Sequence, residues 1–370
     1  MHEALISRAG LHLRSWVTGR PPTGGAAGDG TPTVVLEEPG HLEALLASDV
    51  VGPRTLVLVP GEQEGEEHDA SGATVVGYEG SLSEPGGDAS IGGALFLQVQ
   101  DYGTSPYMSL LGTTLVRVAG QVDFEAFLAD ADLARAEGEF AAFAVSPAVQ
   151  IADLPALGGA DPGDGPATRL YVDRDGGVSV SPHGLRLGTV GEGGAAQLRA
   201  EWDRLTDGSP TGGPVALGAA VPEDVRGPAV RERPWLGRYL GALDVLRDLQ
   251  AHGVGEVRVS GFGRRLVPAL DAVEAPADLA DPRAPYLAWT PEAAYVRVPG
   301  HERTFRLGRQ AAEVAEMLLV HGSAEALLEH AAGDGGARPV PRAAIDQVLR
   351  FFDDRGVPLL SGARVAEVTA

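Results

Sequence analysis

The carboxyl-terminal segment, residues 286–360, most constrains what this chain can fold into, because strand patterns and helix patterns follow one another there in a clear order. Three short runs rich in aromatic and β-branched residues are separated by turn residues. The runs cover residues 286–289, 293–298 and 303–307, and the turns contain Thr290-Pro291 and Pro299-Gly300. Because proline and glycine favour tight turns, the pattern predicts an antiparallel meander of three strands.

Three helices are predicted to follow the meander. The first covers residues 309–320 and ends at Gly322, and the second has Ser323 as its N-cap and ends in the glycine-rich residues 333–336. The third has Pro341 in its first turn and ends at Gly356. Its apolar face is expected to comprise Ile345, Val348, Leu349 and Phe352.

This segment resembles the PqqD-like winged helix known as the RiPP recognition element, which binds the leader of a ribosomally made precursor peptide. The residues that carry the resemblance are Ala294-Tyr-Val-Arg-Val-Pro-Gly, Thr304-Phe-Arg-Leu-Gly and Ile345-Asp-Gln-Val-Leu-Arg-Phe-Phe-Asp-Asp-Arg-Gly-Val. In that family the leader lies as an added strand along the third strand, with its apolar side chains in a groove beside the third helix. The resemblance implies a winged helix-turn-helix of three strands and three helices, over about a fifth of the chain.

The resemblance also implies which residues would bind the peptide. The docking strand would be Arg303, Thr304, Phe305, Arg306 and Leu307, and the groove wall on the third helix would be Ala344, Gln347, Val348, Phe351 and Arg355. An edge strand offers free N–H and C=O groups, so an extended peptide gains main-chain hydrogen bonds there. Phe351 lies off the apolar face and is therefore either half-exposed in the groove or packed on the preceding part of the chain. Arg306 either pairs with a leader carboxylate or stays solvated.

The whole layout is similar to the stand-alone recognition proteins of daptide biosynthesis. Only Leu170-Tyr-Val-Asp-Arg-Asp-Gly and the strand patterns near Thr114 add to the carboxyl-terminal match. The resemblance implies a non-catalytic protein that presents the precursor to separate modifying enzymes, namely a dehydrogenase, an aminotransferase and a methyltransferase.

The front of the chain predicts an α/β or α+β domain over residues 1–145. Its strand patterns cover residues 33–37, 54–59, 73–78, 94–99 and 113–118, and its helix patterns cover residues 41–47 and 124–143. Residues 146–283 are expected to form a middle region with a linker, a β-hairpin around Asp173-Arg-Asp-Gly-Gly, a helix over 235–252 and a strand over 256–260. The peptide-recognition domain would then cover residues 284–370.

Composition excludes several functions. The chain has no cysteine and no lysine, which rules out thiolate metal sites, disulfides, a Walker A loop and a pyridoxal Schiff base. The net charge of −22 disfavours nucleic acid as a partner, because binding phosphates requires cations. No run of 18 apolar residues and no secretory signal is present, so we expect a cytoplasmic protein without a membrane partner.

No catalytic, cofactor-binding or metal-ligating motif emerges from the sequence. Gly261-Phe-Gly263-Arg-Arg-Leu266 is similar to the dinucleotide-binding G-x-G-x-x-G, but Leu266 replaces the third glycine and Pro268 stands where a helix should run. We interpret this stretch as a turn. The histidines form no H-E-x-x-H pair, and no serine lies in a G-x-S-x-G elbow. We therefore predict no cofactor and no metal.

Two other functions compete with peptide recognition. A DNA-binding regulator could use the same winged helix, but residues 286–370 contain 9 Arg against 11 Asp and Glu, a net charge of −2. An enzyme whose amino-terminal domain carries unrecognised chemistry also stays open, because the absence of a familiar motif does not exclude a site.

Overall fold

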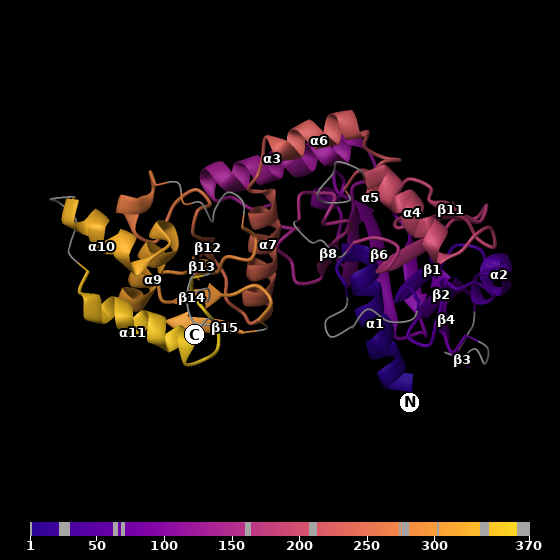
Figure 1. The fold of residues 1–370 in the computed structure, drawn as a ribbon, viewed down its shortest axis with the longest axis horizontal. Coiled ribbons are helices and arrows are strands. Elements are labelled where there is room, and N and C mark those ends of the chain that lie inside the picture. Colours follow the sequence, from indigo (N-terminus) through magenta and orange to yellow (C-terminus); the bar gives the residue numbers. More distant parts are fainter. Residues whose placement is uncertain are drawn as a thin grey trace, which may run out of the picture. The chain divides into compact units, whose positions relative to one another are not determined.

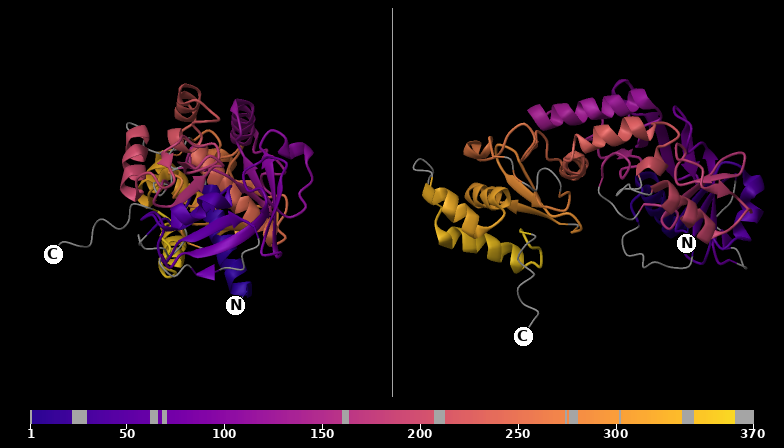
Figure 2. Two further views of the ribbon diagram at one scale, coloured as in Figure 1. Left: turned by 90° about the vertical axis from the view of Figure 1, so that its right-hand side faces the viewer. Right: turned by 45° about the horizontal axis from the view of Figure 1, so that its top comes forward.

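The computed structural model divides the chain into two compact units. The first comprises Met1–Leu128 with Ala148–Arg233, and the second comprises Ala129–Pro147 with Pro234–Ala370. Their elements are labelled in Figure 1, and Figure 2 gives two further views. The structure describes residues 2–21, 30–61, 66–67, 71–159, 164–206, 213–273, 275, 281–301, 303–333 and 340–360.

The first unit is built on a mixed sheet that has eleven strands among the described residues, in the order β11-β10-β9-β1-β2-β4-β5-β6-β7-β8 with β3 beside β4. Strands β1, β2, β4, β6, β7, β8 and β9 all run in one direction. Val and Leu dominate β1 and β2 and are buried, as is typical of parallel strands covered on both faces. The strands are β1 (Thr33–Leu36), β2 (Leu56–Pro60), β3 (Glu66–Glu67), β4 (Thr74–Gly80), β5 (Asp88–Ile91), β6 (Leu95–Asp101), β7 (Thr113–Arg117), β8 (Val149–Ile151), β9 (Arg169–Val172), β10 (Gly177–Ser179) and β11 (Gly188–Thr189).

Helix α1 (His2–Thr18) packs on this sheet and links strands that are far apart in its order. Leu13, Trp16 and Val17 are buried in the core with side chains from the sheet. Trp16 Nε1 donates a hydrogen bond to the Leu170 carbonyl in β9, at 2.9 Å. The backbone N–H of Asp153, just after β8, donates to the Val17 carbonyl, also at 2.9 Å. Since β8 ends the strand order and β9 lies near its opposite end, the sheet must curl around α1.

The remaining helices of the first unit are short, and α6 is anchored by a buried arginine. Arg226 Nη1 donates to the Ala156 carbonyl at 2.8 Å, while its Nε pairs with Glu223 at 2.8 Å. No helix in the described part of the chain is both long enough and apolar enough to cross a membrane. The helices are η1 (Pro39–His41), α2 (Leu42–Leu46), η2 (Ser105–Tyr107), α4 (Ala195–Thr206), α5 (Gly213–Ala216) and α6 (Glu223–Arg231), and α3 (Gln121–Glu137) has residues in both units.

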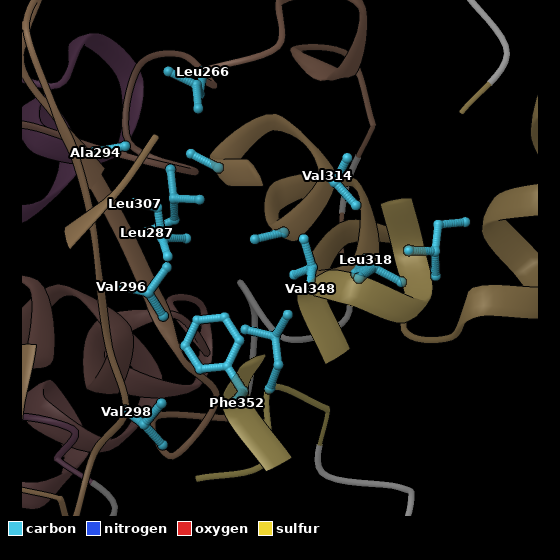
Figure 3. Close-up of a cluster of buried hydrophobic side chains, with 14 of the residues drawn as sticks. Leu266, Leu287, Ala294, Val296, Val298, Leu307, Val314, Leu318, Val348 and Phe352 are labelled. Atoms are coloured by element: carbon cyan, nitrogen blue, oxygen red, sulfur yellow. The ribbon is translucent and has the colours of Figure 1, made fainter. Parts of the chain in front are cut away.

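The second unit contains a four-stranded antiparallel sheet with helices on both faces. The strand order is β12-β13-β14-β15, with bounds Arg258–Val259, Tyr286–Trp289, Ala294–Arg297 and Thr304–Leu307. On one face, Tyr286 packs on α7 (Leu236–Ala251), where the Arg238 guanidinium lies 3.7 Å from the centroid of its ring. On the other face, Leu287 and Val296 enter a core with α9 (Arg309–His321) and α11 (Arg342–Asp353), as Figure 3 shows. Helix α10 (Ala324–Gly333) and η3 (Pro268–Leu270) complete the unit.

The expected fold class is wrong. We expected an α/β or α+β amino-terminal region followed by a winged helix of three strands and three helices. The structure instead has a large mixed sheet, which includes the hairpin β9-β10 from the expected middle region, and a second sheet of four strands rather than three. The fourth strand, β12, and the covering helix α7 both precede residue 284. The pairing of β9 with β1 and of β12 with β13 joins segments that are distant in sequence. Such pairings cannot be predicted from local periodicity.

Candidate functional site

Strand β15 is the outer strand of the four-stranded sheet, and within the described residues no other strand pairs with its second edge. The hairpin between β13 and β14 reveals which main-chain groups face that edge. Thr290 N donates to the Ala293 carbonyl at 2.8 Å, so these two residues form a hydrogen-bonded pair. Hydrogen-bonded and non-hydrogen-bonded pairs alternate along an antiparallel ladder. The main-chain N–H and C=O groups of Tyr295 therefore form hydrogen bonds with β13, and those of Val296 form hydrogen bonds with β15.

The free main-chain groups of β15 belong to Thr304 and Arg306. Val296 lies opposite Phe305, so the main chains of Phe305 and Leu307 hold β15 in the sheet. The N–H and C=O groups of Thr304 and Arg306 point the other way, and in the described part of the chain no hydrogen bond occupies them. An extended peptide lying along this edge would satisfy these groups.

A polar contact on the α7 side of the sheet fixes the edge strand. Thr304 Oγ1 donates a hydrogen bond to Asp248 Oδ2 in α7, at 2.9 Å. The same carboxylate oxygen accepts from Arg297 Nη1 in β14, at 2.6 Å. Both ion-pair partners are less than a third exposed. Asp248 therefore ties β14 and the outer strand β15 to α7 and limits their movement.

Aromatic side chains line the other side of the edge, between β15 and α11. The Phe305 ring stands edge-on to Phe351 at 6.1 Å and to Phe352 at 5.5 Å. Phe352 is fully buried, whereas Phe305 and Phe351 are only half-buried. Arg355 covers Phe351, with its guanidinium carbon 3.8 Å from the ring centroid. Of the two alternatives for Phe351, the structure shows the half-exposed one, next to the edge strand.

Positive charge gathers on the same strand. The side chains of Arg303, Arg306 and Arg355 are exposed. Among the described residues, the guanidinium groups of Arg303 and Arg306 make no ion pair or hydrogen bond, although the chain has a net charge of −22. Asp353 and Asp354 precede Arg355 and are also exposed, so the positive charge that is unpaired among the described residues lies at Arg306 of β15 and at Arg303, just before this strand. Free guanidinium groups suit the carboxylates of an acidic peptide.

The ten residues expected at the peptide site divide into an exposed set and a buried set. Val348 and Leu307 are only 6% and 8% exposed and belong to the hydrophobic core that underlies the exposed residues. Sequence reasoning missed Asp248 and Arg297, because no local pattern connects α7 with β15. The residues at or near the surface are Arg303, Thr304, Phe305, Arg306, Ala344, Gln347, Phe351 and Arg355.

The glycine-rich stretch near residue 261 lines a polar hollow of ≈ 330 Å³ in the second unit. Gly263 has φ +71°, and a Cβ there would lie 2.4 Å from the Glu137 backbone, so glycine is required. Arg265 is buried and donates to the carbonyls of Leu270 and Val273. These contacts make the stretch a packed turn. The hollow is lined by Arg135, Gly261, Gly263, Arg264, Arg265, Asp271, Ala272 and Val273.

In the described part of the chain, no group of three or more histidine or acidic side chains is arranged to hold a metal ion. No protein-family model, curated protein or solved structure matches this chain.

Proposed function

We propose that this chain is a non-catalytic recognition protein that binds the leader of a ribosomally made precursor peptide as an added strand on β15. The observation that carries the proposal is the outward main chain of Thr304 and Arg306, on an edge that no described strand covers. Main-chain hydrogen bonds would give affinity, and side chains at alternate positions of the peptide would give specificity.

The surroundings of the edge define the peptide that fits best. Phe305 and Phe351 offer a half-buried aromatic pair to an apolar side chain. Arg303 and Arg306 offer guanidinium groups that lack partners among the described residues, and these favour Asp or Glu in the peptide. The favoured leader is therefore an extended, acidic segment with large apolar side chains at every second position.

The recognition role places the protein in the cytoplasm, where newly made precursor peptides are released. The chain would hold the leader while separate enzymes, such as a dehydrogenase, an aminotransferase and a methyltransferase, modify the rest of the precursor. Such a division of labour requires no catalytic residue in this chain.

Fluorescence anisotropy of the full chain with a labelled synthetic peptide, extended and acidic with large apolar side chains at every second position, tests the proposal. We expect saturable binding with Kd in the low micromolar range or tighter. Replacing Arg303 and Arg306 together with Gln should weaken binding and flatten its dependence on salt, because exposed charge pairs are screened. A matched control is the pair Arg199→Gln and Arg204→Gln, on the exposed face of α4. Absence of binding at tens of micromolar would reject the proposal.

A further inference from the structure

The first unit gathers polar side chains at one edge of its sheet. Seven strands run in the same direction, so their carboxyl ends meet at that edge. In open α/β sheets, ligands bind outside the carboxyl ends of parallel strands. The polar residues at or just after these strand ends are Glu37, Ser83, Asp101, Arg117, Asp153 and Asp173.

Arg117, the last residue of β7, is the unusual member of this group. Its side chain is 1% exposed, and its guanidinium carbon lies 5.0 Å from the Trp16 ring centroid. Nη2 donates to the Leu82 carbonyl at 3.0 Å, but Nε and Nη1 have no hydrogen-bond partner among the described residues. A guanidinium has five N–H donors, and burying them without acceptors destabilises the folded chain. The folded chain therefore carries a buried cation, Arg117, whose Nε and Nη1 donors lack acceptors among the described residues.

Two more polar groups near Arg117 are only partly satisfied. Asp153 Oδ1 accepts from Arg169 Nη1 at 2.7 Å, whereas its Oδ2 has no hydrogen-bond partner in the described residues. His183 Nε2 is also buried without a partner there. Burial lowers the pKa of His183, and the nearby charge of Arg117 lowers it further. Arg117, Asp153 and His183 lie near enough for their charges to act on one another, and each keeps a buried polar atom without a hydrogen-bond partner among the described residues.

Glu37 and Arg169, two charged neighbours at this edge, are paired and do not use the free donors of Arg117. Glu37 accepts from the Ser83 hydroxyl and forms an ion pair with Arg174 at 3.5 Å. Arg169 is neutralised by Asp164, at 2.8 Å, as well as by Asp153. Asp101, which lies opposite Arg117 in the register of β6 and β7, also has a buried Oδ1 without a hydrogen-bond partner among the described residues.

The local backbone holds this arrangement in place. Asp153 adopts φ +54°, which is uncommon for a residue with a side chain, and such conformations cluster at functional sites. Its N–H bonds to the Val17 carbonyl, at the end of α1. Gly19 has φ +72°, and a Cβ there would lie 2.8 Å from Arg169 Nη2. The ion pair of Asp153 and Arg169 therefore depends on a specific backbone path around it.

We propose that Arg117, together with Asp153 and His183, forms a binding site for a small molecule that carries an oxyanion, a carboxylate or a phosphate. The oxyanion accepts hydrogen bonds from Arg117 Nε and Nη1, and a donor on the ligand reaches Asp153 Oδ2. This site belongs to the first unit and is independent of the peptide edge on β15.

Thermal unfolding of the full chain in inorganic phosphate or acetate, with NaCl keeping the ionic strength constant, tests the site. Specific binding raises Tm in proportion to the logarithm of the anion concentration above its Kd, by roughly 5–10 °C when the anion is about 100 times above its Kd. Arg117→Met should abolish the rise. Arg186→Met, which removes an exposed arginine of the same unit, should keep it. An equal rise in the Arg117→Met variant, or no rise with either anion, overturns the proposal.

A crystal of the wild-type chain grown with selenate keeps the proposal testable if Arg117→Met does not fold. Selenium has an anomalous signal, so a bound selenate can be located without ambiguity. A peak within hydrogen-bond distance of Arg117 Nε or Nη1 supports the site. Water molecules alone bridging Arg117 to Asp153 would overturn it, because buried water often satisfies such groups.

Discussion

Asp248, in α7, accepts a hydrogen bond from the Thr304 hydroxyl in β15, at 2.9 Å. The two residues are 56 positions apart in the sequence, and their contact joins a helix to the outer strand of the sheet. Arg297 in β14 shares the same carboxylate oxygen, at 2.6 Å. The outer strand is consequently held on its α7 side while its main chain stays free at the edge. A strand that is fixed before the peptide arrives loses less entropy on binding.

Asp248→Asn should destabilise the second unit modestly. The substitution removes the negative charge that pairs with Arg297 but keeps an acceptor for Thr304, so we expect a loss of about 1 kcal/mol in the free energy of unfolding. Urea unfolding of the variant and the wild type measures this loss. Asp244→Asn, one turn earlier in α7, is the matched control for a change of helix charge, because Asp244 pairs with Arg247 instead. Equal stability of Asp248→Asn and wild type would contradict the role of this contact.

Thr304→Pro should weaken leader binding because it removes the outward N–H. Proline is tolerated on edge strands, so the sheet should persist. Thr304→Val is the control, since it also loses the hydroxyl that bonds to Asp248 but keeps the N–H. We expect about tenfold weaker binding for the proline variant than for the valine variant, measured by anisotropy. The edge is not the docking strand if the two variants bind equally well.

Phe351 and Phe352 are adjacent in α11, yet their replacement should have different effects. Phe352 is fully buried, so Phe352→Ala should cost about 3–5 kcal/mol of stability. Phe351 is half-buried against Phe305 and Arg355, so Phe351→Ala should affect stability less and lower leader affinity roughly tenfold or more. Chemical unfolding and anisotropy separate the two effects. Unchanged affinity in a folded Phe351→Ala variant would exclude the aromatic pair from the site.

Local patterns predicted the individual elements of the second unit well. Proline, glycine and β-branched runs placed strands at 286–289 and 303–307, where β13 and β15 form. Ser323 is the expected N-cap, and its hydroxyl accepts from Ala326 N at 3.0 Å. On α11 the expected apolar face includes both Val348 and Leu349. The structure buries Val348 and leaves Leu349 half-exposed.

Long-range pairings could not be predicted in the same way. β9 pairs with β1, although more than 130 residues separate them, and β12 joins β13 across the glycine-rich turn near residue 261. Neither pairing can be predicted from the local periodicity of apolar residues. Arg117 shows the same limit for a candidate site: the sequence presents a single arginine after a strand, and only the assembled sheet buries it beside Asp153 and Trp16.

The stability of the first unit should respond to pH through His12. Burial lowers the pKa of His12, and the nearby Arg8 lowers it further, while its Nδ1 lies 2.9 Å from the Thr33 hydroxyl. In the unfolded chain, histidine titrates near pH 6.5. As the pH falls below that value, the unfolded chain takes up a proton that the folded chain resists. The contribution of His12 is therefore present above pH 6.5 and is lost as the pH falls toward its lowered folded pKa.

His12→Gln isolates this contribution, because glutamine cannot titrate in this range. The difference in the free energy of unfolding between wild type and His12→Gln should be larger at pH 8 than at pH 5, in urea titrations at both values. The comparison also removes the background of His183, whose pKa is lowered as well, and of Glu37, whose raised pKa acts in the opposite direction. A difference that stays constant with pH would show that the folded chain binds a proton at His12 as readily as the unfolded chain does.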